Sequence, residues 1–194
     1  MALVLASASS IRAAMLAAAG VAHQVDPARV DESAVKDAHV GDDARLATAL
    51  AEAKAIDTSL RHSENWVIGG DSLVSVAGRR FDKPTDRDEA IAHLRFFSGK
   101  AMQLTSAVAL ARRGRIDWSY AARATLHVRH LSDDFIHTYL ADEWPAVGSC
   151  VGVFRMEGRG ATLFTSVEGD HFTILGMPLL PLLGALRERG LMTS

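Results

Sequence analysis

The stretch from Trp66 to Pro84, WVIGGDSLVSVAGRRFDKP, predicts the centre of both the fold and the candidate site. The apolar pair Val67-Ile68 predicts a short buried strand, and the run from Leu73 to Val76 predicts a second strand that ends at a turn. Asp71 follows two glycines between these runs. A carboxylate at a strand edge, beside glycines that let a ligand approach the backbone, is a common arrangement for holding a metal ion or activating water. The plainer alternative is that Asp71 begins a hairpin turn and that Lys83, near the end of the stretch, is solvated.

Length and composition restrict the class of protein. At 194 residues the chain is expected to form one domain, and a hydrophobic share of 48% is enough for a sizeable core. The net charge of −2 gives no electrostatic basis for binding nucleic acid or a membrane surface. The single cysteine, Cys150, excludes an internal disulfide, and no apolar run approaches the ~20 residues of a membrane-spanning helix. Because the N-terminus has no basic segment before its short apolar run, we expect a cytoplasmic protein without a signal peptide.

The N-terminus contains a candidate anion site. Ala2–Ala6 predicts a buried strand, a serine-rich turn follows, and Ile11–Ala19 predicts a helix that stops at Gly20. Such a turn surrounds a small space with hydroxyls and free backbone N–H groups, which bind anions. Arg12, in the first helical turn, is unfavourably placed for a cation unless an anion offsets the helix dipole. Ordinary N-capping by serine is the alternative interpretation.

Residues 21–56 contain further charged candidates. The polar segment from Val21 to Gly41 predicts a loop, in which the adjacent acids Asp31-Glu32 are expected to be solvated. Asp42-Asp43 then open a predicted helix over Ala44–Ile56, and Lys54 lies at the edge of its buried stripe. A lysine there either snorkels to solvent or points into a cleft.

The rest of the chain predicts alternating helices and strands. In chain order they are a helix capped by Thr85 and ending at Phe97, strands over Met102–Ala111 and Arg115–His130, a helix from Ser132 to Leu140, an irregular segment from Pro145 to Gly160, a strand over Ala161–Ser166 and a helix over Leu179–Arg189.

Several common functional motifs are absent from the sequence. The eight histidines form no HExxH pattern and no pair with the cysteine at zinc spacing. The nucleophile-elbow pattern GxSxG, the Walker A pattern and the dinucleotide-binding GxGxxG pattern are also missing. A built-in zinc site is therefore not expected.

Taken together, the ordered segments resemble the Maf family of nucleoside triphosphate pyrophosphatases over nearly the whole chain. The matching segments are Leu5–Arg12 (LASASSIR) to the family's LASxSPRR, Val30–Glu32 to VDE, Leu46-Ala47 and Ala53–Ala55 to LAxxKA, Ile68–Asp71 to IGADT, Asp82–Pro84 to GKP, Leu94–Gly99 to LRxLSG, Thr105–Leu110 to TxVAL, Gly158–Phe164 to GxGAxLF and Gly169–Pro178 to GDxxxVVGLP. No single segment is specific, but the set in this order is.

The resemblance implies a single Maf-like domain over residues 1–194 with an α/β fold similar to that of the inosine-triphosphate pyrophosphatases. This fold has a mixed twisted sheet with flanking helices, in two lobes around a cleft. The resemblance also implies hydrolysis of a nucleoside triphosphate to the monophosphate and pyrophosphate with Mg²⁺ or Mn²⁺. The implied partner is a small-molecule nucleotide rather than nucleic acid or a membrane, and a homodimer is compatible with the family.

The resemblance assigns roles to individual residues by position. Asp71 corresponds to the general base or metal-linked carboxylate, and Glu32 corresponds to a second acid near the metal. Phosphate binding falls to Ser7, Ser9, Arg12, Lys54 and Lys83. Phosphoryl transfer needs such cations to neutralise the phosphate oxygens and a water oriented in line with the leaving group.

Departures from the family pattern bear on base specificity. The segment Cys150–Gly158, CVGVFRMEG, together with LHVRHLS at 126–132, resembles the branch that hydrolyses 7-methyl-GTP. Glu157 in this segment is chemically suited to methylated guanine, because a carboxylate accepts hydrogen bonds from N1–H and the 2-amino group and favours the ring's positive charge.

Two other positions favour dTTP, UTP or CTP instead. Ser72 is closer to the threonine of the pyrimidine branch, and Ile11 is smaller than the bulky residue that is usual in the 7-methyl-GTP branch. One phosphate-side arginine of the family is also missing. A third alternative, which follows from the family's link to septum formation, is a nucleotide-binding regulator of cell division with little turnover.

Overall fold

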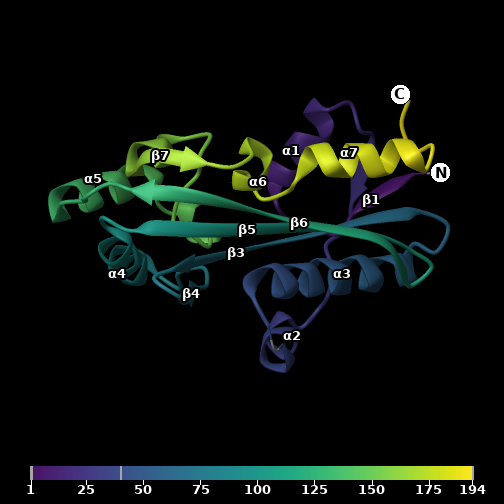
Figure 1. The fold of residues 1–194 in the computed structure, drawn as a ribbon, viewed down its shortest axis with the longest axis horizontal. Coiled ribbons are helices and arrows are strands. Elements are labelled where there is room, and N and C mark those ends of the chain that lie inside the picture. Colours follow the sequence, from purple (N-terminus) through teal and green to yellow (C-terminus); the bar gives the residue numbers. More distant parts are fainter. Residues whose placement is uncertain (1, 40, 194) are drawn as a thin grey trace. The chain divides into compact units, whose positions relative to one another are not determined.

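The computed structural model describes residues 2–39 and 41–193 and has a mixed α/β fold (Figure 1). Its elements are β1 (Leu3–Leu5), α1 (Ser10–Ala18), β2 (His23–Val25), α2 (Glu32–Ala38), α3 (Asp43–Arg61), β3 (Trp66–Val76), β4 (Arg79–Phe81), α4 (Arg87–Phe97), β5 (Ala101–Arg112), β6 (Arg115–Val128), α5 (Asp133–Glu143), the 3₁₀ helices η1 (Ala146–Ser149) and η2 (Arg159–Leu163), β7 (Phe164–Glu168), α6 (His171–Ile174) and α7 (Leu179–Glu188). The strands form one sheet in the order β2-β1-β3-β5-β6-β7, with β4 paired to β3. Because β1 pairs in parallel with β2 and β3 while β4 and β7 pair antiparallel, the predicted mixed sheet is confirmed.

The chain divides into two compact units. Unit 1 comprises Met1–Ser72, Thr105–Ala122 and Asp170–Ser194, and unit 2 comprises Leu73–Leu104 and Arg123–Gly169. Strands β3, β5 and β6 each contribute residues to both units. In the described part of the chain, no helix has both the length and the apolar character needed to cross a membrane.

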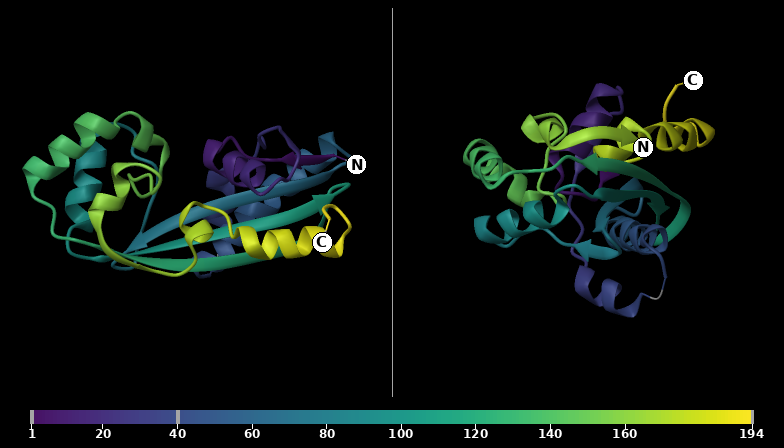
Figure 2. Two further views of the ribbon diagram at one scale, coloured as in Figure 1. Left: turned by 90° about the horizontal axis from the view of Figure 1, so that it is seen from above. Right: turned by 60° about the vertical axis from the view of Figure 1, so that its left-hand side comes forward.

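The strands of unit 1 present their two faces to different helices. Leu3 and Leu5 of β1 and Ile68 of β3 pack in one apolar cluster with residues of α1 and α7. The alternate residues, Val4 and Val67, belong to a separate cluster. Figures 1 and 2 show α7 and α3 on opposite faces of these strands. The period-two alternation of a strand therefore decides which helix each side chain of β3 meets.

Helix α3 approaches β3 unusually closely at Gly69. A Cβ atom at this position would lie 2.1 Å from the backbone oxygen of Ala51 and 2.7 Å from the backbone nitrogen of Ala55. Contacts this short do not occur between real side chains and backbone, so the approach requires glycine here. Alanines at both facing positions of α3 complete the close packing.

Unit 2 contains the helical pair α4 and α5 (Figure 2). The two helices are joined by an ion pair between Arg95 Nε and Asp133 Oδ1 at 2.7 Å. Phe81 of β4 packs edge-to-face on Phe97 of α4, with ring centroids 4.8 Å apart. Tyr139 of α5 is buried, and its hydroxyl donates to the backbone oxygen of Val153 at 2.9 Å.

Two predictions around the candidate site were wrong. Asp71 neither begins a turn nor lies at a strand edge, because β3 continues without interruption from Trp66 to Val76. Of the two glycines before it, Gly69 serves the close approach of α3, and Gly70 faces the Arg12 side chain. The predicted loop over Val21–Gly41 contains β2 and α2, and Asp31 is the N-cap of α2.

Element boundaries differ elsewhere for local reasons. Helix α3 extends past the predicted end at Ile56 to Arg61. The N-cap of α4 is Asp86, whose side chain accepts from the Glu89 backbone N–H at 2.8 Å, and Thr85 instead donates to the Glu89 carboxylate. The last strand begins only at Phe164, because residues 159–163 form η2.

Candidate functional site

Three charged side chains from three elements of unit 1 meet at Lys54. Its Nζ lies 2.6 Å from Asp71 Oδ1 on β3 and 2.7 Å from Glu32 Oε1 on α2. The side chains of Lys54 and Asp71 are 13% and 10% exposed, whereas that of Glu32 is 45% exposed. Lys54 therefore points to the two carboxylates and does not snorkel, and the structure brings together three residues that the resemblance named.

Glu32 owes its position to the start of α2. Asp31 caps the helix, and its Oδ1 accepts from the Ser33 backbone N–H at 3.1 Å and from the Ala34 backbone N–H at 3.3 Å. Hydrogen bonding, first of all with the Ser33 side chain, lowers the pKa of Asp31 below its ordinary value. Glu32 is then the first helical residue, where the helix dipole favours an acid.

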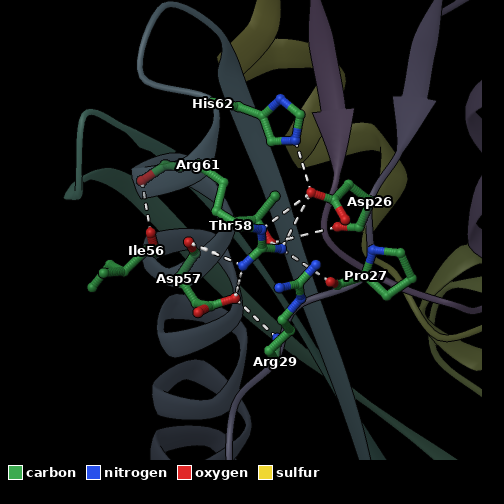
Figure 3. Close-up of polar contacts among 9 residues, drawn as sticks. Asp26, Pro27, Arg29, Ile56, Asp57, Thr58, Arg61 and His62 are labelled. Atoms are coloured by element: carbon green, nitrogen blue, oxygen red, sulfur yellow. Dashed lines mark hydrogen bonds and ion pairs between the residues drawn. The ribbon is translucent and has the colours of Figure 1, made fainter.

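A second polar network, which no sequence pattern indicated, holds the chain that leads to Glu32 (Figure 3). Arg61, at the end of α3, donates from Nη2 to the backbone oxygen of Pro27 at 3.1 Å and from Nη1 to Asp57 Oδ2 at 2.5 Å. Asp57 Oδ2 also accepts from the Arg29 backbone N–H at 2.9 Å. His62 Nε2 lies 2.7 Å from Asp26 Oδ2. The C-terminal turns of α3 thus fix residues 26–29, while Lys54 of the same helix pairs with Glu32.

Arg12 is a buried crosslink in unit 1. It donates from Nε to Gly176 O at 2.8 Å, from Nη1 to Ser7 Oγ at 3.0 Å and Gly70 O at 2.9 Å, and from Nη2 to Ser72 Oγ at 2.9 Å. These bonds use four of the five N–H groups of a guanidinium. Strand β1 ends at Leu5, so the bond to Gly70 O takes the place of a missing ladder hydrogen bond on β3. The structure thus gives Arg12 a structural role, and its predicted phosphate role stays untested.

The serines predicted for the phosphate turn also have internal partners. Ser9 is the N-cap of α1 and accepts from the Arg12 backbone N–H at 3.4 Å, and Ser7 Oγ accepts from the Ser9 backbone N–H at 3.3 Å. Ser72 Oγ donates to Gly176 O at 3.1 Å and lies 2.9 Å from Ser106 Oγ. The capping interpretation is confirmed for Ser9, and the specificity position Ser72 is tied into the Arg12 network. Ile11, the other specificity candidate of this unit, is half-buried in the first turn of α1.

The two groups of charges lie on opposite faces of the unit 1 sheet but interact. Ser72 turns toward Arg12, so the preceding residue, Asp71, turns to the α3 face, where it meets Lys54. Burial lowers the pKa of Arg12, and the negative charges of Asp71 and Glu32 oppose this shift. With two cations and two carboxylates, these four side chains carry no net charge.

Lys83 and Glu157 belong to unit 2, and both are exposed. Burial raises the pKa of the half-buried Cys150 thiol; Glu157 raises it further, whereas Arg155 and Lys83 lower it. Lys83 and Glu157 therefore have opposite effects on the pKa of the Cys150 thiol.

The carboxylates of unit 1 are chemically suited to a hard divalent cation. Asp71 and Glu32 offer oxygen ligands, and Mg²⁺ is typically held by one or two carboxylates together with substrate phosphates and water. Among residues 2–39 and 41–193, no three or more His, Cys, Asp or Glu side chains are grouped so that they could hold a metal ion. The donor set fits a cation that a phosphate-bearing ligand helps to coordinate and does not fit an all-protein cage.

Comparisons with known proteins agree with the motifs. The family described as Maf-like protein matches residues 2–189. A nucleoside triphosphate pyrophosphatase of Granulibacter bethesdensis is 45% identical over 196 residues, covering 100% of both chains. One from Paramagnetospirillum magneticum is 47% identical over 189 residues, covering 96% of this chain and 97% of its own. A 7-methyl-GTP pyrophosphatase of Rhizobium meliloti is 44% identical over 191 residues, covering 97% of this chain and 96% of its own.

Proposed function

Because this chain belongs to the Maf family, we propose that it is a nucleoside triphosphate pyrophosphatase that releases pyrophosphate and the nucleoside monophosphate. The observation that carries this proposal is the contact of Lys54 Nζ with both Asp71, at 2.6 Å, and Glu32, at 2.7 Å. A buried lysine between two carboxylates is costly to desolvate, and such arrangements are often found at functional sites.

In the proposed reaction, Asp71 is the general base. Its Oδ1 is held by Lys54, and its other oxygen is the one that would accept a proton from the attacking water. Lys54 fixes the orientation of this carboxylate and adds positive charge beside the substrate's phosphates. Glu32, which is partly exposed at the start of α2, supplies the second carboxylate.

Mg²⁺ or Mn²⁺ is the proposed cofactor, and Asp71 and Glu32 are the residues that would hold it. Bound there, the cation would neutralise the phosphate oxygens and the charge that develops on the pyrophosphate leaving group. The balance of charge among four side chains of unit 1 supports a need for this cation. The charges of four side chains, Arg12, Lys54, Asp71 and Glu32, sum to zero, so these side chains cannot by themselves neutralise the negative charge of a triphosphate.

For the phosphates, we propose the turn before α1 and Lys83. The hydroxyl of Ser10 and the first backbone N–H groups of α1 lie at the positive end of the helix dipole, and Ser10 is exposed. Lys83 is an exposed cation in unit 2. Hydrogen bonds among Ser7, Ser9 and Arg12 would then hold the backbone of the phosphate-binding turn in place.

For the base, we propose 7-methyl-GTP, with Glu157 as the group that recognises it. The exposed carboxylate of Glu157 is available for the N1–H and 2-amino donors of guanine, and its charge suits the methylated ring. A relative named as a 7-methyl-GTP pyrophosphatase, 44% identical, supports this choice. A pyrimidine nucleotide is the second candidate, motivated by the modest size of Ile11. Ser72 argues less for it, because its hydroxyl is already bonded to Arg12 and Gly176.

The first experiment measures pyrophosphate release from 7-methyl-GTP, GTP, dTTP, UTP and CTP with Mg²⁺ or Mn²⁺. Asp71→Asn should lower kcat by about 10²–10⁴-fold, the usual contribution of a general base. Asp117→Asn is the matched control, since it removes one carboxylate from an exposed ion pair with Arg189 in the same unit. Equal losses in both variants, or none in Asp71→Asn, would refute the assignment.

Base recognition needs a second pair of variants. Glu157→Gln should move the substrate ranking away from 7-methyl-GTP, whereas Glu168→Gln, which changes an exposed partner of His127 in unit 2, should leave it unchanged. If the unaltered protein releases pyrophosphate fastest from pyrimidine nucleotides, the proposed reaction stands and the proposed preference for 7-methyl-GTP is refuted.

The alternative of a cell-division regulator would be favoured if the folded protein releases pyrophosphate from no nucleotide. A division phenotype that survives Asp71→Asn would also favour it. A cytoplasmic location and a homodimer also remain predictions.

A further inference from the structure

A buried glutamate of unit 2, Glu143, clamps the segment that carries Glu157. Glu143 is the last residue of α5 and is 5% exposed. Its Oε2 accepts two hydrogen bonds from the Arg155 guanidinium, from Nε at 3.0 Å and from Nη2 at 2.8 Å. Its Oε1 accepts from the Arg159 backbone N–H at 3.1 Å. The clamped positions are two residues before and two residues after Glu157.

The segment within the clamp has little space to adopt other conformations. A Cβ atom at Gly160 would lie 2.4 Å from the Arg155 backbone oxygen, so the chain closes tightly on itself. A Cβ atom at Gly158 would lie 3.2 Å from Glu143 Oε1. Both glycines thus pack against the clamp, and the segment between Arg155 and Gly160 forms a compact loop around Glu143.

The chain just before the clamp is strained and is also held by α5. Val153 has a φ of +56°, a conformation that is rare for a β-branched residue. It is kept there by the Tyr139 hydroxyl, which donates to its backbone oxygen at 2.9 Å, and by its own N–H, which donates to Cys150 O at 3.0 Å. Backbone strain of this kind persists where surrounding contacts over-determine it, and it concentrates at ligand-binding segments.

The clamp fixes the backbone but leaves the Glu157 carboxylate exposed. Hydrogen bonding to Glu143 raises the pKa of Arg155, and Glu157 also acts on that guanidinium. Arg155 is therefore shared electrostatically between the buried glutamate and the exposed one. Glu143 Oε2 accepts both of these Arg155 hydrogen bonds, and the Glu157 carboxylate is exposed to solvent.

We propose that Glu143 is a positioning residue for base selection, which acts by holding Glu157 in place through Arg155 and the Arg159 N–H. This inference rests on the proposed function, in which Glu157 recognises the base. Glu143 itself does not contact the substrate. Its loss should therefore change the preference among nucleotides only as long as Glu157 is present.

The test combines a double-mutant cycle with amide hydrogen exchange. Glu143→Gln keeps the shape of the side chain but removes its charge and replaces one acceptor oxygen by an NH₂ donor, so either the Arg155 guanidinium or the Arg159 N–H loses its acceptor. The ratio of kcat/KM for 7-methyl-GTP to that for GTP should fall by about tenfold, mainly through KM for 7-methyl-GTP, as for loss of one charged hydrogen bond. Glu157→Gln should lower the ratio at least as much, and adding Glu143→Gln to it should lower the ratio no further. Exchange of the amides in residues 155–160 should become faster in Glu143→Gln.

Asp142→Asn is the matched control. Asp142 neighbours Glu143 on α5, and its carboxylate pairs with the Arg159 side chain, but it is 43% exposed and makes no contact with Arg155. The control should leave both the selectivity ratio and the exchange near residue 155 unchanged. It thereby separates the buried clamp from a general effect of charge at the end of α5.

The outcomes separate this inference from the proposed function. Unchanged exchange in residues 155–160 of Glu143→Gln would overturn the clamp whatever the substrate is. Additive losses of selectivity in the double variant would show that Glu143 acts by another route and would also overturn the inference. If Glu157→Gln leaves the ranking unchanged, the proposed base recognition fails and the selectivity role of Glu143 fails with it, while faster exchange would still establish the clamp.

Discussion

Replacing Gly69 by alanine should damage both stability and catalysis through one displacement. The new Cβ atom would lie 2.1 Å from the Ala51 backbone oxygen, whereas ordinary van der Waals contact begins at 3.4 Å. Because the opposing atoms are backbone, α3 has to retreat from β3 by about 1 Å instead of rotating a side chain. Lys54 is carried on α3, so its 2.6 Å bond to Asp71 would lengthen beyond the usual hydrogen-bond limit.

The expected magnitudes follow from that displacement. Overpacking of a well-packed core typically costs about 1–3 kcal/mol, which corresponds to a drop in Tm of roughly 2–12 °C for a chain of this length. A misplacement of about 1 Å in catalytic groups is expected to lower kcat by about 10²-fold. Thermal unfolding and pyrophosphate release with the preferred nucleotide measure the two effects separately.

Two other glycines provide matched controls for the same chemical change. At Gly184, inside α7, a Cβ atom would have no neighbour within 4 Å, so alanine should stabilise the fold by about 0.5–1 kcal/mol. At Gly70 the nearest atom, Arg12 Nε, would lie at 3.3 Å, a much less severe contact than the one at Gly69, so the cost should be smaller. A Gly69→Ala protein with normal Tm and normal kcat would refute the view that this glycine sets the position of Lys54.

Three further predictions concern contacts outside the Lys54 pairings. Arg12→Lys should lower the free energy of unfolding in urea by about 1–3 kcal/mol for each buried carbonyl left without a donor, since an ammonium lacks the guanidinium fork. Hydrogen bonding, first of all with His62, lowers the pKa of Asp26. The ionised Asp26 should therefore stabilise the fold fully above about pH 4, and this stabilisation should disappear as the pH falls through the folded-state pKa. In Asp26→Asn, the free energy of unfolding should fall less steeply over the same acidic range when it is measured against pH. Tyr139→Phe should cost about 1–3 kcal/mol in urea unfolding because the Val153 backbone oxygen loses its donor, and an unchanged midpoint would contradict that bond.

Sequence patterns predicted most elements because the apolar periodicity is strong there. The long strands β5 and β6 and the final helix α7 were predicted near their observed bounds, and α3 was predicted except for its C-terminal residues 57–61. β2 was missed because it has only three residues and most of it is exposed, which removes the apolar signal. α2 was missed because it has no buried residue and its helical period is invisible in hydropathy. The available signals were its N-cap, Asp31, the first-turn acid Glu32 and the last-turn base Lys36.

The sequence named residues that the structure brings together, but it did not predict how they are arranged. The family resemblance named Glu32, Lys54 and Asp71, which the structure brings together, yet the glycines before Asp71 were interpreted as room for a ligand to approach the backbone, whereas Gly69 faces α3. A signal for the true arrangement was present in α3, where small residues spaced four apart, Ala51 and Ala55, complement a glycine on a facing strand. The Arg61 network joins residues about thirty positions apart, and single-sequence periodicity contains no information on such contacts.

The alternation of β3 explains why positive charge alone does not make unit 1 a triphosphate site. Asp71 meets Lys54 on one face of the sheet, and the next residue, Ser72, meets Arg12 on the other. Each cation already faces an acceptor of the protein itself, and the carboxylates of Asp71 and Glu32 balance the two charges. A highly anionic substrate therefore gains little from these cations unless it brings a divalent metal that the same carboxylates prefer. If the proposed reaction is correct, the requirement for Mg²⁺ or Mn²⁺ follows from this balance, because the groups that would hold the metal are the ones that cancel the lysine.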